Sequence, residues 1–383
     1  MTFEFATAAR IVFGQGAIAE LPQIAREWGR RALVVTGRNA ERAEAVRREL
    51  RGLGIECREF SVHGEPTVEM VRRGTEAARA GCDVVIGFGG GSAMDAAKAI
   101  AALAKNAGDV LDYMEGVGRG WVLERAGLPF LAVPTTAGTG AEVTKNAVIG
   151  SPEHGVKASV RSASMLAKVA VIDPELTRDA PREVTAASGL DALTQLVEAY
   201  VSPRANAMTD LFCVEGLKLA ANSLDRVYRD GHDMDAREAM SLAALLSGLA
   251  LANAGLGAVH GFAGPLGGML DAPHGALCAA VLPHATAVNI RALRDREPDG
   301  EGLRRYGEVG RILTGREDAR AEDAAEWMAE TCRGMAISNL RRHGLDQGQI
   351  PELVEKASRA NSMKANAVKL TEGELREVAE RTL

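Results

Sequence analysis

Two histidines, an aspartate and a glutamine are the residues of the second half best suited to chemistry. His260 and His274 lie in "VHGFAGPLGGMLDAPHG", among small and apolar residues, and Asp191 and Gln195 lie in "SGLDALTQLVEAY". Asp191 and Gln195 are about one helical turn apart and therefore share a helix face. One carboxylate, one amide and two imidazoles together suit a divalent metal with a position open for a substrate oxygen. The alternative is two satisfied core histidines and a capping aspartate.

A glycine-rich segment in the first half is a candidate phosphate site. "CDVVIGFGGGSAMDAAKAIAALA" joins a buried strand to an alanine-rich helix. Backbone N–H groups in such a loop can approach a dinucleotide pyrophosphate at the positive end of the helix. The segment matches neither the usual Rossmann fingerprint nor a P-loop, and an ordinary tight turn is the alternative. The candidate cofactor-binding residues here are Gly89, Gly90, Gly91, Ser92 and Asp95.

A second loop, "PTTAGTGAE", follows another apolar run and is rich in hydroxyl groups. Thr135, Thr136 and Thr139 could donate hydrogen bonds to a ribose or a phosphate. Equally, these hydroxyls could cap a helix that starts near Gly140.

The elements that must position these residues differ between the two halves of the chain. Before residue 180, short apolar runs alternate with helical patterns, which predicts βαβ units and a parallel sheet covered on both faces. After it, long Ala/Leu-rich stretches with helical spacing predict only helices. We therefore expect an α/β dinucleotide-binding domain over 1–180 and an all-helical metal- and substrate-binding domain over 181–383.

Composition narrows the class of partner. The 383 residues are 46% hydrophobic and carry a net charge of −6 with no long basic run, which disfavours nucleic acid and favours a small molecule. No uninterrupted apolar run long enough for a bilayer and no secretory signal are evident, so we expect a cytoplasmic protein away from membranes. Five scattered cysteines without a CxxC fit neither a disulfide scaffold nor a thiolate zinc site, and most are expected to fill the core.

Several motifs in the same order resemble the iron-containing, or group III, alcohol dehydrogenase family. They are "GFGGGSAMDAAKAIA", "PTTAGTGAEVTKNAVI", "VIDPELT", "GLDALTQLVEAY", "NAGLGAVHGFAGPLGG" and "APHGALCAAVLPH". The resemblance implies a dinucleotide-binding α/β domain, a helical domain, a cleft holding nicotinamide and a catalytic Fe²⁺ or Zn²⁺, and a homodimer. It places Asp191, His260 and His274 on three of the family's metal-ligand positions, where they would be the catalytic residues.

The sequence departs from the family at two site positions. Gln195 stands where the family usually has the fourth metal ligand, a histidine, and an amide oxygen is the weaker donor toward Fe²⁺ or Zn²⁺. Gly264 stands where many relatives carry a histidine close to the substrate. The proton must then come from water, the ribose hydroxyls or another side chain. A reductase that works without metal therefore remains an alternative.

Cofactor preference follows from the turn after the first predicted strand of the α/β half. Relatives that favour NAD have an acidic residue there, whereas "VVTGRNAER" offers Gly37, Arg38 and Asn39. A carboxylate would repel a 2′-phosphate and an arginine would accept it, which predicts NADP(H) over NAD(H). A surface arginine at a turn is the alternative. Lys157 matches a lysine that lies near the nicotinamide ribose in relatives.

The function expected is reversible hydride transfer between NADPH and a small aldehyde or ketone whose oxygen is polarised by a divalent metal. A metal-independent enzyme of the maleylacetate-reductase type is the first alternative. A lyase resembling dehydroquinate synthase is the second, but it would need a basic cluster that the sequence lacks beyond Lys145 and Lys157. A nucleotide sensor without activity has no supporting feature.

Overall fold

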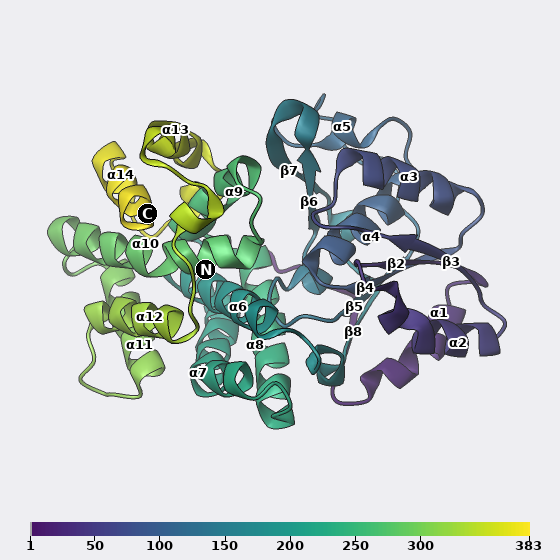
Figure 1. Ribbon diagram of the computed structural model, residues 1–383, viewed down its shortest axis with the longest axis horizontal. Coiled ribbons are helices and arrows are strands. Elements are labelled where there is room, and N and C mark those ends of the chain that lie inside the picture. Colours follow the sequence, from purple (N-terminus) through teal and green to yellow (C-terminus); the bar gives the residue numbers. More distant parts are fainter. Residues whose placement is uncertain (1) are drawn as a thin grey trace. The chain divides into compact units, whose positions relative to one another are not determined.

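The computed structural model describes residues 2–383, and these form two compact units (Figure 1). An α/β unit comprises Ala6–Thr136 and Gly140–Arg178. A helical unit comprises Asp179–Leu383 together with residues 2–5 and Ala137–Thr139. The main passage from one unit to the other comes after Arg178, close to the expected boundary at residue 180. The short segment Ala137–Thr139 also belongs to the helical unit, and a single boundary does not account for it.

The α/β unit is built on a six-stranded parallel sheet, as predicted. Its central strands are apolar at nearly every position because helices cover both faces. The short first strand was not predicted, nor was a separate antiparallel hairpin. The sheet order is β1 (Arg10–Phe13), β8 (Val169–Ile172), β5 (Phe130–Pro134), β4 (Val84–Gly89), β2 (Arg31–Thr36) and β3 (Glu56–Ser61), and the hairpin joins β6 (Asn146–Ser151) to β7 (Val156–Arg161).

Helices lie on both faces of this sheet (Figure 1). One face is covered by α1 (Leu21–Arg26) and α2 (Glu44–Gly52), whose leucines and isoleucines pack against the central strands. The other face is covered by α3 (Val68–Arg79) and α4 (Gly91–Leu103). Alanines allow α4 to pack closely, and almost all of it is buried. A single turn, α5 (Val110–Tyr113), follows.

The helical unit contains helices as its only regular structure among the described residues, which confirms the predicted fold class. Its core is formed around α6 and α10, and α6 is buried over most of its length. By length and composition α10 could cross a bilayer, but 72% of its apolar stretch is buried, as in the core helix of a globular protein. The helices are α6 (Arg182–Val201), α7 (Ala207–Arg229), α8 (Met234–Ala254), α9 (Ala258–Met269), α10 (His274–Arg296), α11 (Glu301–Thr314), α12 (Ala321–Gly334), α13 (Ile350–Arg359) and α14 (Glu372–Arg381).

Short 3-10 helices punctuate the loops of both units. They lie at Ala17–Glu20, Ala40–Ala43, Ala141–Val143, Pro152–His154, Ala163–Met165, Pro174–Thr177, Leu340–His343, Gln347–Gln349 and Ser362–Ala365.

Candidate metal centre and nucleotide loops

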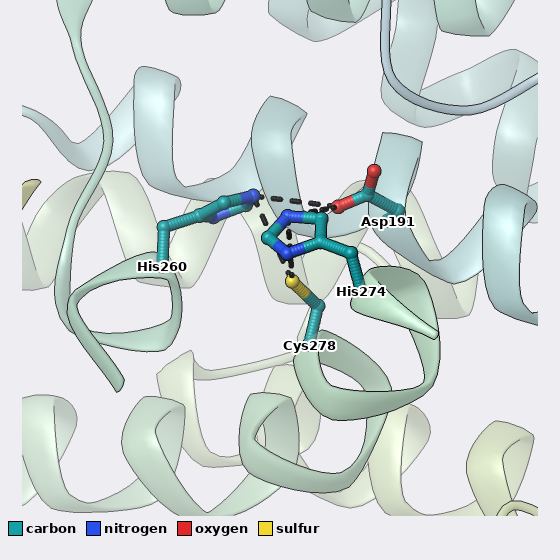
Figure 2. Close-up of side chains that lie close together, drawn as sticks. All are labelled: Asp191, His260, His274 and Cys278. Carbon is teal, nitrogen blue, oxygen red and sulfur yellow. Dashed lines mark hydrogen bonds and ion pairs between the residues drawn. The ribbon is translucent and has the colours of Figure 1, made fainter. Parts of the chain in front are cut away.

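Four side chains of the helical unit point toward one another in Figure 2. Asp191 comes from α6, His260 from α9, and His274 and Cys278 from the first turns of α10. One donor atom from each lies within 4.8 Å of the other three. The structure thus brings together Asp191, His260 and His274, three residues singled out in the sequence, and adds a cysteine that was expected only to fill the core.

The distances between these donor atoms are those of neighbours around one point. Asp191 Oδ1 lies 3.3 Å from His260 Nε2 and 3.8 Å from His274 Nε2. Cys278 Sγ lies 3.5 Å from His274 Nε2 and 3.8 Å from His260 Nε2. Asp191, His260 and Cys278 are buried, whereas the side chain of His274 is 39% exposed. The cluster is therefore open to solvent at His274.

A close approach between α6 and α10 places His274 beside Asp191. A Cβ at Gly275 would overlap the backbone carbonyl of Ala187 on α6, so no larger residue fits at this contact. Pro273 is the N-cap residue in extended backbone, and α10 begins at His274. Cys278 follows one turn later on the same face.

His260 is held in one orientation by Glu198 of α6. Glu198 Oε2 lies 2.7 Å from His260 Nδ1, and Oε1 accepts the backbone N–H of Val259 at 2.6 Å. With Nδ1 bonded to a carboxylate, the lone pair of Nε2 is free for the cluster. Glu198 is not among the candidate residues of the sequence analysis. Its position two helical turns after Asp191, on the same helix face, was a signal that it could lie near the cluster.

Gln195 is placed differently from the expected metal ligand. Its Nε2 donates to Asp191 Oδ2 at 3.0 Å, and its Oε1 accepts from the hydroxyl of Ser247 on α8 at 2.7 Å. Both ends of the amide therefore have partners, and the oxygen expected to coordinate a metal is bonded to Ser247. In this arrangement Gln195 is hydrogen-bonded to Asp191, and Cys278 presents the fourth potential ligand atom of the cluster.

The cluster favours positive charge, which protonated histidines or a bound cation would supply. Asp191 Oδ1 is buried and accepts no hydrogen bond, an arrangement that is costly unless a positive charge lies nearby. Burial alone lowers the pKa of His260, but Cys278 and Asp191 outweigh it and raise that pKa well above its usual value. Cys278 likewise raises the pKa of His274 to about 9. A carboxylate oxygen, two imidazole nitrogens and a sulfur are a donor set that fits a divalent metal ion.

The glycine loop lies at the point of the sheet where ligands usually bind. The chain runs from β2 to its neighbour β3 and then to β4 on the other side of β2, and open parallel sheets bind ligands at the carboxyl ends beside such a reversal. Gly89 ends β4, and Gly90 and Gly91 start α4. Gly89 has φ of 158°, and a Cβ there would lie 3.3 Å from the backbone nitrogen of Gly37 after β2. The two loops are therefore in contact.

The remaining predicted nucleotide residues have varied surroundings. Arg38 and Asn39 are exposed beyond β2. Thr135 is buried and Thr136 lies against Gly90. The 3-10 helix Ala141–Val143 has Gly140 at its N-cap position, with no side-chain cap hydrogen bond there.

Asp95 and Lys157 already have protein partners. Asp95 Oδ2 accepts the backbone N–H of Val148 at 3.0 Å, and its carboxylate pairs with Lys98, which ties α4 to β6. Lys157 lies on β7 with its Nζ 3.8 Å from Glu65. Ser92 lies in the first turn of α4. Of these residues, Asp95 has the clearest structural role.

Gly264 leaves an open position on α9, one turn after His260. The residue is exposed, and a Cβ there would meet no atom within 4 Å. Nothing on α9 therefore replaces the histidine that many relatives carry at this position.

One chain that combines a parallel α/β unit, with glycine turns at its switch point, and a helical unit with a candidate metal site has the architecture of a two-domain dehydrogenase. Residues 8–174 match the family description "Iron-containing alcohol dehydrogenase", and residues 185–383 match "Fe-containing alcohol dehydrogenase family, C-terminal". The chain belongs to the iron-containing alcohol dehydrogenase family.

Relatives and solved structures agree with this assignment. The chain is 36% identical over 357 residues to 1,3-propanediol dehydrogenase of Klebsiella pneumoniae, covering 91% of this chain and 90% of that one. It is 35% identical over 291 residues to NAD-dependent methanol dehydrogenase of Bacillus methanolicus, covering 74% and 75%. A crystal structure of 1,3-propanediol oxidoreductase superposes with a TM-score of 0.91 at 31% identity over the full length of both chains.

The predicted activity is thereby confirmed at the level of the enzyme class. The chain is an alcohol dehydrogenase, an oxidoreductase that interconverts an alcohol and a carbonyl compound by hydride transfer with a nicotinamide cofactor. The lyase interpretation is set aside by the same matches.

Proposed function

We propose that Asp191, His260 and His274 hold a divalent metal and that the enzyme interconverts a small alcohol and its aldehyde or ketone. The observation that carries this is the buried Asp191 Oδ1, which has no hydrogen bond and faces the Nε2 atoms of both histidines. When bound, the ion would polarise the carbonyl oxygen and stabilise the developing alkoxide.

The surrounding residues would prepare the three donors. Glu198 orients His260, and Gln195 holds Asp191 by its other oxygen, so that Oδ1 is left for the ion. Backbone N–H groups of the glycine loop at the start of α4 would bind the cofactor pyrophosphate. Because α9 has no side chain at Gly264, we propose that water or a ribose hydroxyl delivers the proton to the product alkoxide.

Metal content and turnover of His260→Ala test this proposal. Protein reconstituted anaerobically with Fe²⁺ or Zn²⁺ should hold about one ion per chain by mass spectrometry. His260→Ala should lose the ion and reduce kcat/KM by about 100-fold or more, whereas the exposed His232→Ala should change neither. Near-normal turnover by His260→Ala, or insensitivity to EDTA, would support the metal-independent reductase instead.

We further propose that the enzyme prefers NADP(H), in contrast to the relative whose name specifies NAD. Supporting this, the exposed turn after β2 holds Arg38 and no carboxylate, and it contacts the glycine loop through Gly37. Arg38→Ala should lower kcat/KM with NADPH by about tenfold and leave the value with NADH nearly unchanged. Arg48→Ala, another exposed arginine of this unit, is the control. Higher efficiency with NADH in the unaltered enzyme would contradict the proposal.

We also propose that the enzyme works as a homodimer in the cytoplasm. Membership of the family supports the first expectation, and five unpaired cysteines are typical of a reducing compartment. Light scattering on the purified protein would measure the mass, and a monomer would contradict the dimer.

A further inference from the structure

We propose that Cys278 is the fourth protein ligand of the metal, in place of Gln195, and that its sulfur makes the site selective for zinc over iron. This inference rests on the proposed metal site, and it concerns a residue that the family's usual ligand set of one aspartate and three histidines does not contain. Four observations carry it.

The first observation is the direction of the sulfur. Cys57, Cys82 and Cys332 each donate their S–H to a backbone carbonyl, which is how a buried thiol is usually satisfied. Cys278 Sγ instead faces the Nε2 atoms of His260 and His274. Among these four cysteines, Cys278 therefore differs in presenting its sulfur to the same point as two imidazoles.

The second observation is metric. Tetrahedral zinc with bonds of about 2.0–2.1 Å to nitrogen or oxygen and about 2.3 Å to one sulfur requires donor separations of about 3.3–3.6 Å. The contacts of Asp191 Oδ1 with the two Nε2 atoms are 3.3 and 3.8 Å, and those of Cys278 Sγ with the same atoms are 3.5 and 3.8 Å. The 3.3 and 3.5 Å separations match this geometry, and the two 3.8 Å separations are slightly wider, which would leave room for a substrate oxygen as a fifth ligand.

The third observation concerns the competing ligand. The oxygen of Gln195 accepts a hydrogen bond from Ser247, and its nitrogen donates to Asp191. To coordinate a metal, this amide would have to turn its oxygen from Ser247 toward the cluster, and Asp191 Oδ2 would lose the N–H donor that now faces it. Cys278 is fully buried and already directed at the cluster, so it needs no such change.

The fourth observation is charge. One carboxylate, one thiolate and two neutral imidazoles balance a divalent ion, with the thiol proton and any protons held by the two imidazoles released to solvent on binding. Replacing the amide oxygen of Gln195 by a thiolate adds both a negative charge and a soft donor. Soft thiolate donors favour zinc, whereas a mononuclear Fe²⁺ site is better served by imidazole and carboxylate.

Sulfur ligation has spectroscopic signatures that do not depend on turnover. Co²⁺ added to metal-free full-length protein should produce a thiolate-to-cobalt charge-transfer band in the near ultraviolet. X-ray absorption of the zinc-loaded protein should show a single sulfur at about 2.3 Å. In Cys278→Ser both signals should disappear and zinc affinity should fall by at least about tenfold, with a smaller loss for Fe²⁺. Cys57→Ser, in the α/β unit, should retain both signals.

The outcomes separate this inference from the proposed function. A bound ion with only nitrogen and oxygen neighbours in the unaltered protein would overturn the cysteine ligand and leave the metal-dependent dehydrogenase intact. Retention of the cobalt band in Cys278→Ser would do the same. Failure of the unaltered protein to bind Zn²⁺, Fe²⁺ or Co²⁺ would overturn both proposals. Measurement on the unaltered chain keeps the test valid even if the serine variant is unstable.

Discussion

At the scale of single residues, the candidate metal centre depends on side chains that touch no substrate. Glu198 orients the imidazole of His260 through its Nδ1 atom. Gln195 donates a hydrogen bond to the carboxylate of Asp191 and accepts one from the hydroxyl of Ser247. Such partners restrict the rotamers of the ligands and raise the basicity of the coordinating nitrogen. The cluster is therefore assembled before an ion arrives, and removal of a supporting residue should weaken binding without unfolding the protein.

Glu198→Gln tests this support. The amide preserves the shape of the side chain but removes the charge that Nδ1 of His260 faces at 2.7 Å. We expect metal affinity to fall by about 10- to 100-fold, measured by competition with a chromophoric chelator. The exposed Glu183→Gln on the same helix is the control. Unchanged affinity in Glu198→Gln would show that the carboxylate has no influence on the ligand.

At the scale of elements, α6 and α10 act as the two sides of the site. Asp191, Gln195 and Glu198 follow one another along a single face of α6, whereas His274 and Cys278 occupy the first turns of α10. The separation of α6 and α10 sets the distance between the carboxylate of Asp191 and the imidazole of His274. Gly275 allows the two helices to approach closely, because it has no side chain at their contact.

Gly275→Ala should therefore disturb the site through the helices. The added methyl overlaps the carbonyl oxygen of Ala187, so α10 must move away from α6. We expect a loss of about 1–3 kcal/mol in the free energy of unfolding and at least about tenfold weaker metal binding, measured by urea denaturation and metal titration. Gly307→Ala in α11, where only a flexible arginine is near, should be neutral or slightly stabilising. Equal effects of the two variants would contradict the proposed contact.

A second prediction for α10 concerns acid stability and His284. Burial, and secondarily Arg381, lowers the pKa of His284 from 6.5 to about 4. In the unfolded chain the imidazole of His284 has its usual pKa and therefore binds a proton more readily than in the folded protein. The contribution of neutral His284 to the free energy of unfolding is complete above pH 6.5 and is lost as the pH falls toward 4. Urea denaturation at pH 6.5 and at pH 4 measures the free energy of unfolding that is lost on acidification. His284→Asn should make this loss smaller by about 2 kcal/mol. The exposed His232→Asn should leave it unchanged.

At the scale of the whole molecule, the two units have separate cores and separate tasks. The glycine turns lie in the α/β unit, whereas all four candidate metal donors lie in the helical unit. An ion that binds only the folded helical unit stabilises that unit by mass action, by about 2.7 kcal/mol at 100 times the dissociation constant. A nucleotide bound at the turns does the same for the sheet.

Hydrogen exchange measured by mass spectrometry should separate these effects. Removal of the metal by EDTA should speed exchange in α6, α9 and α10 and leave β4 and the start of α4 nearly unchanged. Addition of NADPH should slow exchange at the β4–α4 turn. An equal loss of protection in both units on chelation would contradict independent stabilisation.

The sequence by itself determined the fold class and most of the site. Continuous apolar runs such as Val84–Gly89 identify buried parallel strands, and helical spacing identifies α6 and α10, because both patterns are local. Three of the four clustered residues were singled out as polar side chains in apolar surroundings, and the resemblance to the family placed them on metal-ligand positions. The four-residue β1 escaped prediction because a strand so short is defined by its pairing with β8 and not by its own pattern.

Only the tertiary structure revealed Cys278 as the candidate fourth donor. In the sequence, Cys278 is one of five scattered cysteines, and buried thiols commonly fill cores. Gln195, by contrast, has the spacing of a ligand. Its oxygen is bonded to Ser247, a residue of another helix, and the thiol of Cys278 reaches the cluster because α10 begins against α6. Contacts between helices distant in the sequence determine which donor faces the site, and no local pattern records them.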